Sequence, residues 1–256
     1  MESKDTIEFI CLGSGSTGNA YVFKKHDHYV LVECGFEYNK LAKKILNANL
    51  LLCNCDAVVV THKHSDHAKA LKEFIEKGVN CYAPETCFAD EYKSYPNVHI
   101  VNDGDKFTLN NWLKILCFPV CHDVEAYGYA FLDTENKDSI LFINDTKLFD
   151  FKYNNVGFNY IFIECNHIRK QLEAIMQKSL DDGKEHEVFK FKRQASYHLG
   201  LYSCKKLLNK MNLSQTRAIF LMHLSRECCN DTIVKAEINE VYKKPTFVCY
   251  ENGRIN

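Results

Sequence analysis

The sequence predicts an α/β fold in which two β-sheets pack face to face and helices cover the outside. Short apolar strands occur in two runs along the 256 residues, and each run alternates with its own helical segments. The composition, with 46% hydrophobic and 25% charged residues, is ordinary for a globular protein of this length. We therefore expect a single domain that spans residues 1–256 and has a full two-layer core.

The first run consists of short strands joined by tight turns. A glycine-rich stretch at residues 13–18 is followed by a strand rather than a helix, so we expect a hairpin turn there and not a phosphate-binding loop. Helical spacing appears at residues 41–48 and 68–77. Strands are predicted at residues 7–12, 20–23, 29–33, 57–60, 80–83, 99–101, 113–118, 128–132 and 140–143.

A second alternation of strands and helices begins at residues 160–164. Helical segments at residues 169–179 and 201–211 then flank strands at 218–221 and 246–249. The charged stretch from Leu180 to Arg193 is the least core-like part of the chain, and we expect a mobile excursion there.

Charge and hydropathy exclude several classes of protein. A formal net charge of -1 argues against a protein that coats nucleic acid nonspecifically, although a local basic patch stays open. No apolar run approaches the roughly 20 residues that span a bilayer, and the first residues do not resemble a signal peptide. We expect a cytoplasmic protein with no membrane partner, whose 13 cysteines are reduced.

The run Thr-His-Lys-His-Ser-Asp-His at residues 61–67 indicates a metal site. Its three histidines and one aspartate directly follow an apolar strand, and such ligands suit zinc or a related divalent metal. On a helix His62 and His64 would point about 200° apart, so a compact turn is expected. The alternative, a histidine-rich surface turn, does not explain the strand before the run or the helix after it.

Further polar residues stand at the ends of later apolar strands. These are His122, Asp145, Glu164 and His223, and strand ends are where α/β scaffolds place their chemistry. Each alone fits an ordinary surface or packed residue. Their occurrence in order after the histidine-rich run favours one shared site.

Together these motifs resemble the metallo-β-lactamase superfamily nearly from end to end. The nearest resemblance is to its YycJ/WalJ-type branch, which is related to ribonuclease Z, the endonuclease that processes transfer-RNA 3′ ends. The matching segments are residues 12–20, 61–67, 120–123, 144–146, 164–167, 197–199 and 221–225.

The resemblance implies a four-layer αββα metallo-β-lactamase sandwich with a dinuclear site at one edge of the sheets. It implies two divalent metal ions, zinc with manganese as the alternative. One ion would be held by His62, His64 and His122, the second by Asp66, His67 and His223, with Asp145 bridging the two. Glu33 stands where the family pattern usually has aspartate, as a partner of a metal-binding histidine.

The same resemblance implies hydrolysis of a phosphodiester by a metal-bound hydroxide, which Asp66 would orient. His198, assisted by Glu164, would donate a proton to the leaving alkoxide. The alternative for His198 is a capping role at the helix that follows it. The predicted function is a nuclease acting on DNA or RNA. The alternatives are a cyclic nucleotide phosphodiesterase, a lactone or thioester hydrolase, and a metal-stabilised binding module.

Departures from the family pattern surround the expected substrate rather than the metals. Lys147 replaces the usual glycine after Asp145 and Thr146, and the segment between His167 and His198 looks long. Five cations either contact substrate phosphates or form a solvated face: Lys147, Lys152, Lys190, Lys192 and Arg193. The expected partner is a nucleic acid or nucleotide substrate, and a homodimer stays open.

Overall fold

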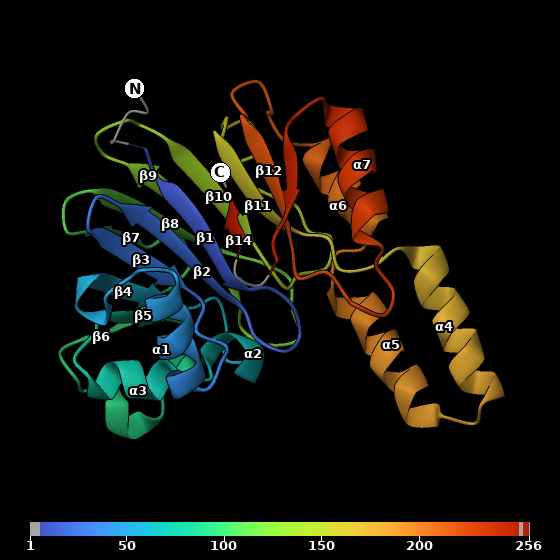
Figure 1. Ribbon diagram of the computed structural model, residues 1–256, viewed down its shortest axis with the longest axis horizontal. Coiled ribbons are helices and arrows are strands. Elements are labelled where there is room, and N and C mark those ends of the chain that lie inside the picture. Colours follow the sequence, from blue (N-terminus) through green and yellow to red (C-terminus); the bar gives the residue numbers. More distant parts are fainter. Residues whose placement is uncertain (1–5, 251–252, 256) are drawn as a thin grey trace. The chain divides into compact units, whose positions relative to one another are not determined.

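The computed structural model describes residues 6–250 and 253–255 of the chain (Figure 1). The chain divides into two compact units. Unit 1 contains residues up to Pro119, residues 124–139 and the segment from Cys249 onward, and unit 2 contains Val120–Asp123 and Ile140–Val248. Both units combine strands with helices, which confirms the predicted α/β class. Among the described residues, no helix is long and apolar enough to cross a membrane.

A seven-stranded sheet in the order β14-β1-β2-β3-β4-β5-β6 forms the core of unit 1. The glycine-rich stretch joins β1 to β2, which pair antiparallel, so the predicted hairpin turn is confirmed. From β3 to β6 neighbouring strands are parallel, and their carboxyl ends therefore share one edge. The strands are β1 (Glu8–Gly13), β2 (Ala20–Lys25), β3 (His28–Val32), β4 (Cys55–Val59), β5 (Cys81–Ala83), β6 (Val98–Ile100) and β14 (Gly253–Ile255).

The helices of unit 1 bury one face each against this sheet. α1 (Tyr38–Asn47) buries Leu41 and Ile45, one turn apart, in a cluster with side chains of β1 to β5. The predicted helix at residues 68–77 is divided into the single turn α2 (Ser65–Ala68) and α3 (Leu71–Glu76). Three 3-10 turns complete the connections: η1 (Leu52–Asn54), η2 (Glu85–Cys87) and η3 (Asp90–Tyr92).

Three further strands of unit 1 pair antiparallel: β7 (Lys106–Leu109), β8 (Leu113–Pro119) and β9 (Tyr127–Asp133). The buried Phe131 ring on β9 meets Phe23 of β2 edge-on, with 5.1 Å between ring centroids. Lys25 at the end of β2 donates to both oxygens of Asp133, at 2.8 and 2.7 Å, and both side chains are buried. β7 was not expected from the sequence.

Four parallel strands form the core of unit 2: β10 (Ser139–Ile143), β11 (Tyr160–Glu164), β12 (Ala218–Met222) and β13 (Thr246–Val248). They are apolar on both faces, as expected of strands that are covered on both sides. The register brings the carboxyl ends of the first three strands to within one residue of one another, because Ile143 pairs with Ile163 and Ile163 with Leu221. Side chains that follow these residues therefore reach the same edge.

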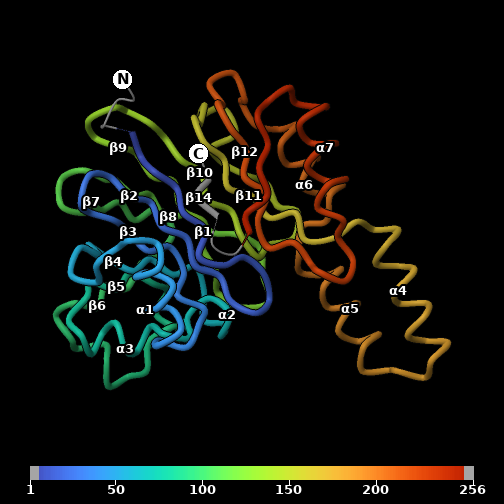
Figure 2. The backbone as a smooth tube through the Cα atoms, viewed as in Figure 1, coloured from blue at the N-terminus to red at the C-terminus, as the bar shows by residue number. Residues whose placement is uncertain are grey.

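Unit 2 also contains four helices: α4 (Arg169–Asp181), α5 (Glu185–Tyr197), α6 (Leu201–Leu208) and α7 (Asp231–Tyr242). α4 and α5 run side by side as a hairpin (Figures 1 and 2). The expected mobile excursion from Leu180 to Arg193 is therefore wrong, since the segment is mostly helix α5. Its charges lie on the exposed side, while Val188 and Phe191 are buried three residues apart. α7 was also not expected.

Candidate active site

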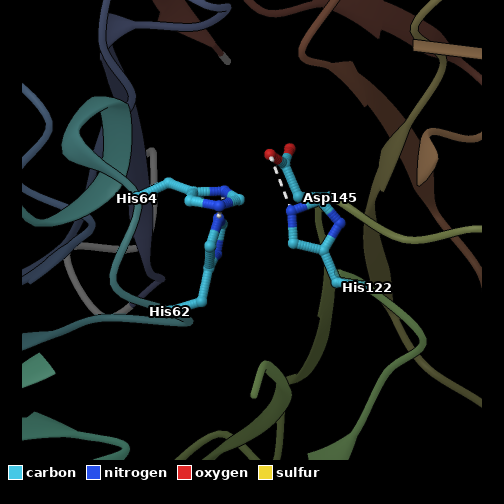
Figure 3. Close-up of side chains that lie close together, drawn as sticks. All are labelled: His62, His64, His122 and Asp145. Atoms are coloured by element: carbon cyan, nitrogen blue, oxygen red, sulfur yellow. Dashed lines mark hydrogen bonds and ion pairs between the residues drawn. The ribbon is translucent and has the colours of Figure 1, made fainter. Parts of the chain in front are cut away.

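The histidine-rich run leaves the carboxyl end of β4 in a compact turn and continues into α2, which contains Asp66 and His67. The side chains of His62 and His64 point toward each other, with 3.0 Å between Nε2 of His62 and Nδ1 of His64 (Figure 3). The rings of His62 and His67 lie 4.1 Å apart between centroids, and both residues are fully buried. The predicted turn thus brings three imidazoles of unit 1 together.

Buried oxygens lie beside the Nδ1 atoms of two histidines of this run and favour a proton there. The Thr61 hydroxyl donates to Oε1 of Glu33 at 2.6 Å, so its lone pair can accept from Nδ1 of His62, 2.8 Å away. Oε1 of Glu33 also lies 3.1 Å from Nδ1 of His67. With each Nδ1 carrying the proton, each Nε2 has the lone pair that a metal ion needs. Glu33 thus lies beside a predicted metal-binding histidine, as expected.

The glycine-rich turn of unit 1 holds the backbone of the histidine-rich run. Asn19 donates twice to the carbonyl of Asp66, from its backbone N–H at 2.8 Å and from Nδ2 at 3.1 Å. A Cβ at Gly35 would lie 1.7 Å from the same carbonyl oxygen, so only glycine fits there. The Asp66 carboxylate stays about a quarter exposed, with Oδ2 3.5 Å from Nε2 of His67.

In unit 2, Asp145 and His223 follow the ends of β10 and β12 in left-handed backbone conformations. Their φ angles are 43° and 55°, and Glu33 of unit 1 has a φ of 67°. Residues other than glycine seldom adopt these angles, and such strain collects at functional sites. The chain changes direction sharply at both residues, at the carboxyl ends of β10 and β12. Their side chains meet there, with 3.4 Å between Nε2 of His223 and Oδ1 of Asp145.

His122 lies against the same aspartate from the Val120–Asp123 segment of unit 2. Its Nε2 lies 4.0 Å from Oδ2 of Asp145 (Figure 3). The same atom lies 3.2 Å from Oδ1 of Asp123. Burial lowers the pKa of His122, and the two carboxylates partly oppose this effect. The neutral imidazole favoured by burial is the form that binds metal ions.

The Glu164 carboxylate, at the end of β11, holds His198. Its Oε1 lies 2.6 Å from Nδ1 of His198, while Oε2 accepts from the backbone N–H groups of Thr146 and Leu199 at 3.0 Å each. Glu164 is fully buried and His198 is partly exposed. The capping alternative for His198 is wrong, because the N-cap of α6 is Gly200 and His198 directly follows the last residue of α5.

Several supporting residues of unit 2 were not predicted in these roles. Asn166 donates from Nδ2 to the carbonyl of His223 at 2.8 Å, and its Oδ1 accepts from Gln194 on α5. Arg193 on the same helix pairs with Oδ2 of Asp123. The sequence shows no signal for Gln194, since its partner Asn166 is distant along the chain.

The predicted metal ligands therefore form two groups, and the structure brings the members of each group together. Within unit 2, ligand atoms of Asp145, Glu164, His198 and His223 all lie within 4.8 Å of one another. Both oxygens of Glu164 are taken by donors of the protein, which leaves Asp145 and His223 for a metal. Unit 1 contains His62, His64, Asp66 and His67, and unit 2 contains His122, Asp145 and His223. The donors are all nitrogen or oxygen, which fits zinc or manganese.

Parallel strands with imidazole and carboxylate groups at their carboxyl ends define an α/β protein with the ligand chemistry of a metal-dependent hydrolase. Residues 28–224 match the family described as the β-lactamase superfamily domain, and the chain belongs to this family. The predicted superfamily and its fold class are confirmed.

Two curated relatives agree with this assignment. The chain is 26% identical over 235 residues to exodeoxyribonuclease WalJ of Streptococcus pneumoniae, covering 86% of this chain and 82% of the relative. It is 24% identical over 256 residues to exodeoxyribonuclease YycJ of Bacillus anthracis, covering 94% and 91%. These matches confirm the predicted resemblance to the YycJ/WalJ branch.

Two solved structures share the fold across nearly their whole length. The metallo-β-lactamase fold protein YhfI of Bacillus subtilis superposes with a TM-score of 0.71 at 15% identity, covering 97% of this chain and 98% of that one. The short form of human tRNase Z superposes with a TM-score of 0.61 at 12% identity, covering 97% and 98%.

Proposed function

We propose that this protein is a metal-dependent phosphodiesterase that hydrolyses DNA. The observation that carries the proposal is the pair formed by Glu164 and His198, with 2.6 Å between Oε1 and Nδ1. A phosphodiester of DNA loses a sugar alkoxide, which needs a proton to leave readily. Hydrolysis of a lactone or thioester makes no such demand on a histidine at this position.

The proposal assigns two divalent ions to the seven predicted ligands. The residues that would hold them are His62, His64, Asp66, His67, His122, Asp145 and His223. The positions of Thr61 and Glu33 beside the two Nδ1 atoms support this assignment, because a proton on Nδ1 would put the lone pair of each imidazole on Nε2, the atom that would coordinate an ion. When bound, the ions would lower the pKa of water and stabilise charge on a phosphoryl oxygen.

The protein's own residues would then manage the protons. Asp66 orients the attacking water and accepts a hydrogen bond from it. As the new bond to phosphorus forms, the bond from phosphorus to the sugar oxygen breaks. His198 donates the proton from Nε2 to that oxygen, while Glu164 holds Nδ1 and stabilises the protonated ring before transfer. The products are a phosphomonoester and an alcohol.

DNA is favoured over RNA because the curated relatives WalJ and YycJ are both described as exodeoxyribonucleases. The test is a substrate panel of linear DNA, RNA, cyclic mononucleotides and an acyl-homoserine lactone, with zinc-loaded, manganese-loaded and chelator-treated protein. We expect metal-dependent cleavage of DNA that Asp145→Ala abolishes. Hydrolysis of the lactone or of cyclic nucleotides, with DNA left intact under every metal, would overturn the proposal.

A further inference from the structure

Helix α5 has an exposed face that leads directly to His198. Phe189, Lys192 and Ser196 are three and four residues apart and therefore lie on one side of the helix. All three are exposed, and the Phe189 ring retains 70% of its accessible surface. α5 ends at Tyr197, the residue before the proposed proton donor.

The charges of α5 are divided along its length. Its two glutamates lie in the first turn, whereas residues 188–198 contain Lys190, Lys192 and Arg193 and no carboxylate. None of these cations lies in the last turn of the helix, so they do not serve to balance the helix dipole. These three cations therefore have a role other than balancing the helix dipole.

Two of these cations fix the helix, and one faces outward. Arg193 pairs with Asp123, whose other oxygen lies 3.2 Å from Nε2 of His122, and Lys190 pairs with Glu227. These ion pairs hold α5 against the segment that contains His122 and against Glu227. Lys192, in contrast, is exposed and forms no ion pair with any carboxylate in the part of the chain that the structure describes.

The basic surface continues past the end of the helix. Nζ of Lys147, two residues after Asp145, lies 5.9 Å from the centre of the Tyr197 ring. The Tyr197 ring in turn meets His122 edge-on, with 6.2 Å between centroids. We name the α5 track the exposed stripe of Phe189, Lys192 and Ser196 together with Tyr197 and Lys147 at the end of the helix.

We propose that the α5 track binds the DNA strand beside the scissile phosphate, with a base stacked on Phe189 and a phosphate at Lys192. This inference rests on the proposed function. Exposed aromatic rings stack on bases of any sequence, and an unpaired lysine attracts the phosphate backbone. A single exposed aromatic residue is unremarkable by itself, but here it is aligned with an unpaired cation and ends at the proton donor.

The helix geometry predicts how far along the substrate this contact lies. Phe189 is eight residues before Tyr197, which is about 12 Å at 1.5 Å per residue. At about 3.4 Å per nucleotide of a helical strand, the stacked base lies roughly three to four nucleotides from the scissile bond. Shorter substrates would therefore not reach Phe189.

The test measures steady-state cleavage of single-stranded DNA of two to eight nucleotides by the metal-loaded protein. For the wild type we expect KM to fall about tenfold as the substrate reaches five or six nucleotides. Phe189→Ala and Lys192→Glu should each remove most of this gain through KM, while kcat changes less than twofold. Lys192→Glu should also weaken the salt dependence of binding, with the slope of log K against log salt reduced by about one.

Matched controls come from the other helix of the hairpin. Leu180→Ala removes an exposed apolar side chain of α4, and Lys178→Glu reverses an exposed cation there. Both variants should keep the wild-type dependence on substrate length. If they lose it as the α5 variants do, the α5 track has no specific role and the inference is overturned.

The remaining outcomes separate this inference from the proposed function. If the wild type cleaves DNA and both α5 variants keep its dependence on length, the α5 track does not bind substrate and the proposed function stands. If Phe189→Ala instead converts a dimer to a monomer in analytical ultracentrifugation with unchanged KM, the track is an interface between copies and the inference is wrong. If the wild type cleaves none of the oligonucleotides, the proposed function fails and the inference falls with it.

Discussion

Oε1 of Glu164 lies 2.6 Å from Nδ1 of His198, at the carboxyl end of β11. The second oxygen of the same carboxylate accepts two backbone N–H groups, from Thr146 and Leu199. The carboxylate is therefore fixed from two sides before any substrate binds, and it fixes the imidazole in turn. Such preorganisation favours proton transfer, because no free energy is then needed to orient the imidazole during the reaction.

Two substitutions at Glu164 should separate orientation from stability. Glu164→Gln keeps an oxygen for the two N–H groups but presents an amide nitrogen to His198, so DNA turnover should fall about 10²-fold or more with metal content unchanged. Glu164→Ala should in addition lower the free energy of unfolding by about 2–5 kcal/mol, since two buried N–H groups lose their acceptor. Turnover and urea denaturation measure the two effects, and wild-type turnover of Glu164→Gln would refute the pairing.

Shortening Glu33 should weaken metal binding without unfolding the protein. In Glu33→Asp the carboxylate withdraws from the Thr61 hydroxyl and from Nδ1 of His67, so both imidazoles lose their fixed tautomer. We expect zinc affinity in a chelator competition to fall about 10- to 100-fold. Glu37→Asp, at an exposed glutamate, is the control and should bind zinc as the wild type does. Equal affinity in both variants would show that Glu33 does not position the ligands.

The ion pair between Lys25 and Asp133 should contribute strongly to the stability of unit 1. Lys25→Met leaves the buried Asp133 carboxylate without its partner, and we expect a loss of about 3–5 kcal/mol in the free energy of unfolding. The neighbouring Lys24→Met removes a partly exposed pair with Glu8 and should cost at most about 1 kcal/mol. Urea denaturation compares the two, and similar losses would contradict the burial argument.

Cys53 in the 3-10 turn η1 and Cys55 at the start of β4 should react very differently with a thiol reagent. Cys53 is exposed, whereas burial raises the pKa of Cys55 to about 12. At pH 8 almost none of Cys55 is thiolate, so iodoacetamide should modify Cys53 first and leave Cys55 intact. Peptide mass spectrometry after brief labelling distinguishes the two sites. Labelling of both at the same rate would mean that this turn opens readily.

The clustering of the proposed metal ligands was predictable from the sequence, because they are either close together along the chain or directly follow apolar strands. His62, His64 and His67 lie within six residues, and Asp145 and His223 each come within two residues of a strand end. The residues that hold these ligands were harder to predict, because they act across the fold. Asn19 reaches Asp66 across 47 positions, and Glu33 reaches Thr61 across 28.

Helix α5 was missed for a different physical reason. Its buried side consists of few apolar residues, Val188 and Phe191 among them, within a strongly charged segment. Packing of Phe191 against Leu172 and Cys228 stabilises the helix, and these partners are distant in the sequence. Local pattern alone therefore favoured an irregular excursion. In the folded protein Lys190 and Arg193 of this segment form ion pairs, and Lys192 belongs to the α5 track.

The leaving-group dependence of His198→Ala tests the central claim most directly. A sugar alkoxide needs the proton that His198 would donate, whereas p-nitrophenolate leaves readily without one. We predict that His198→Ala lowers kcat/KM for linear DNA about 10²- to 10⁴-fold but lowers it less than tenfold for bis(p-nitrophenyl) phosphate. His186→Ala, at an exposed histidine of α5, should leave both values unchanged. Equal losses on both substrates, with metal content retained, would contradict the role of His198 as the proton donor.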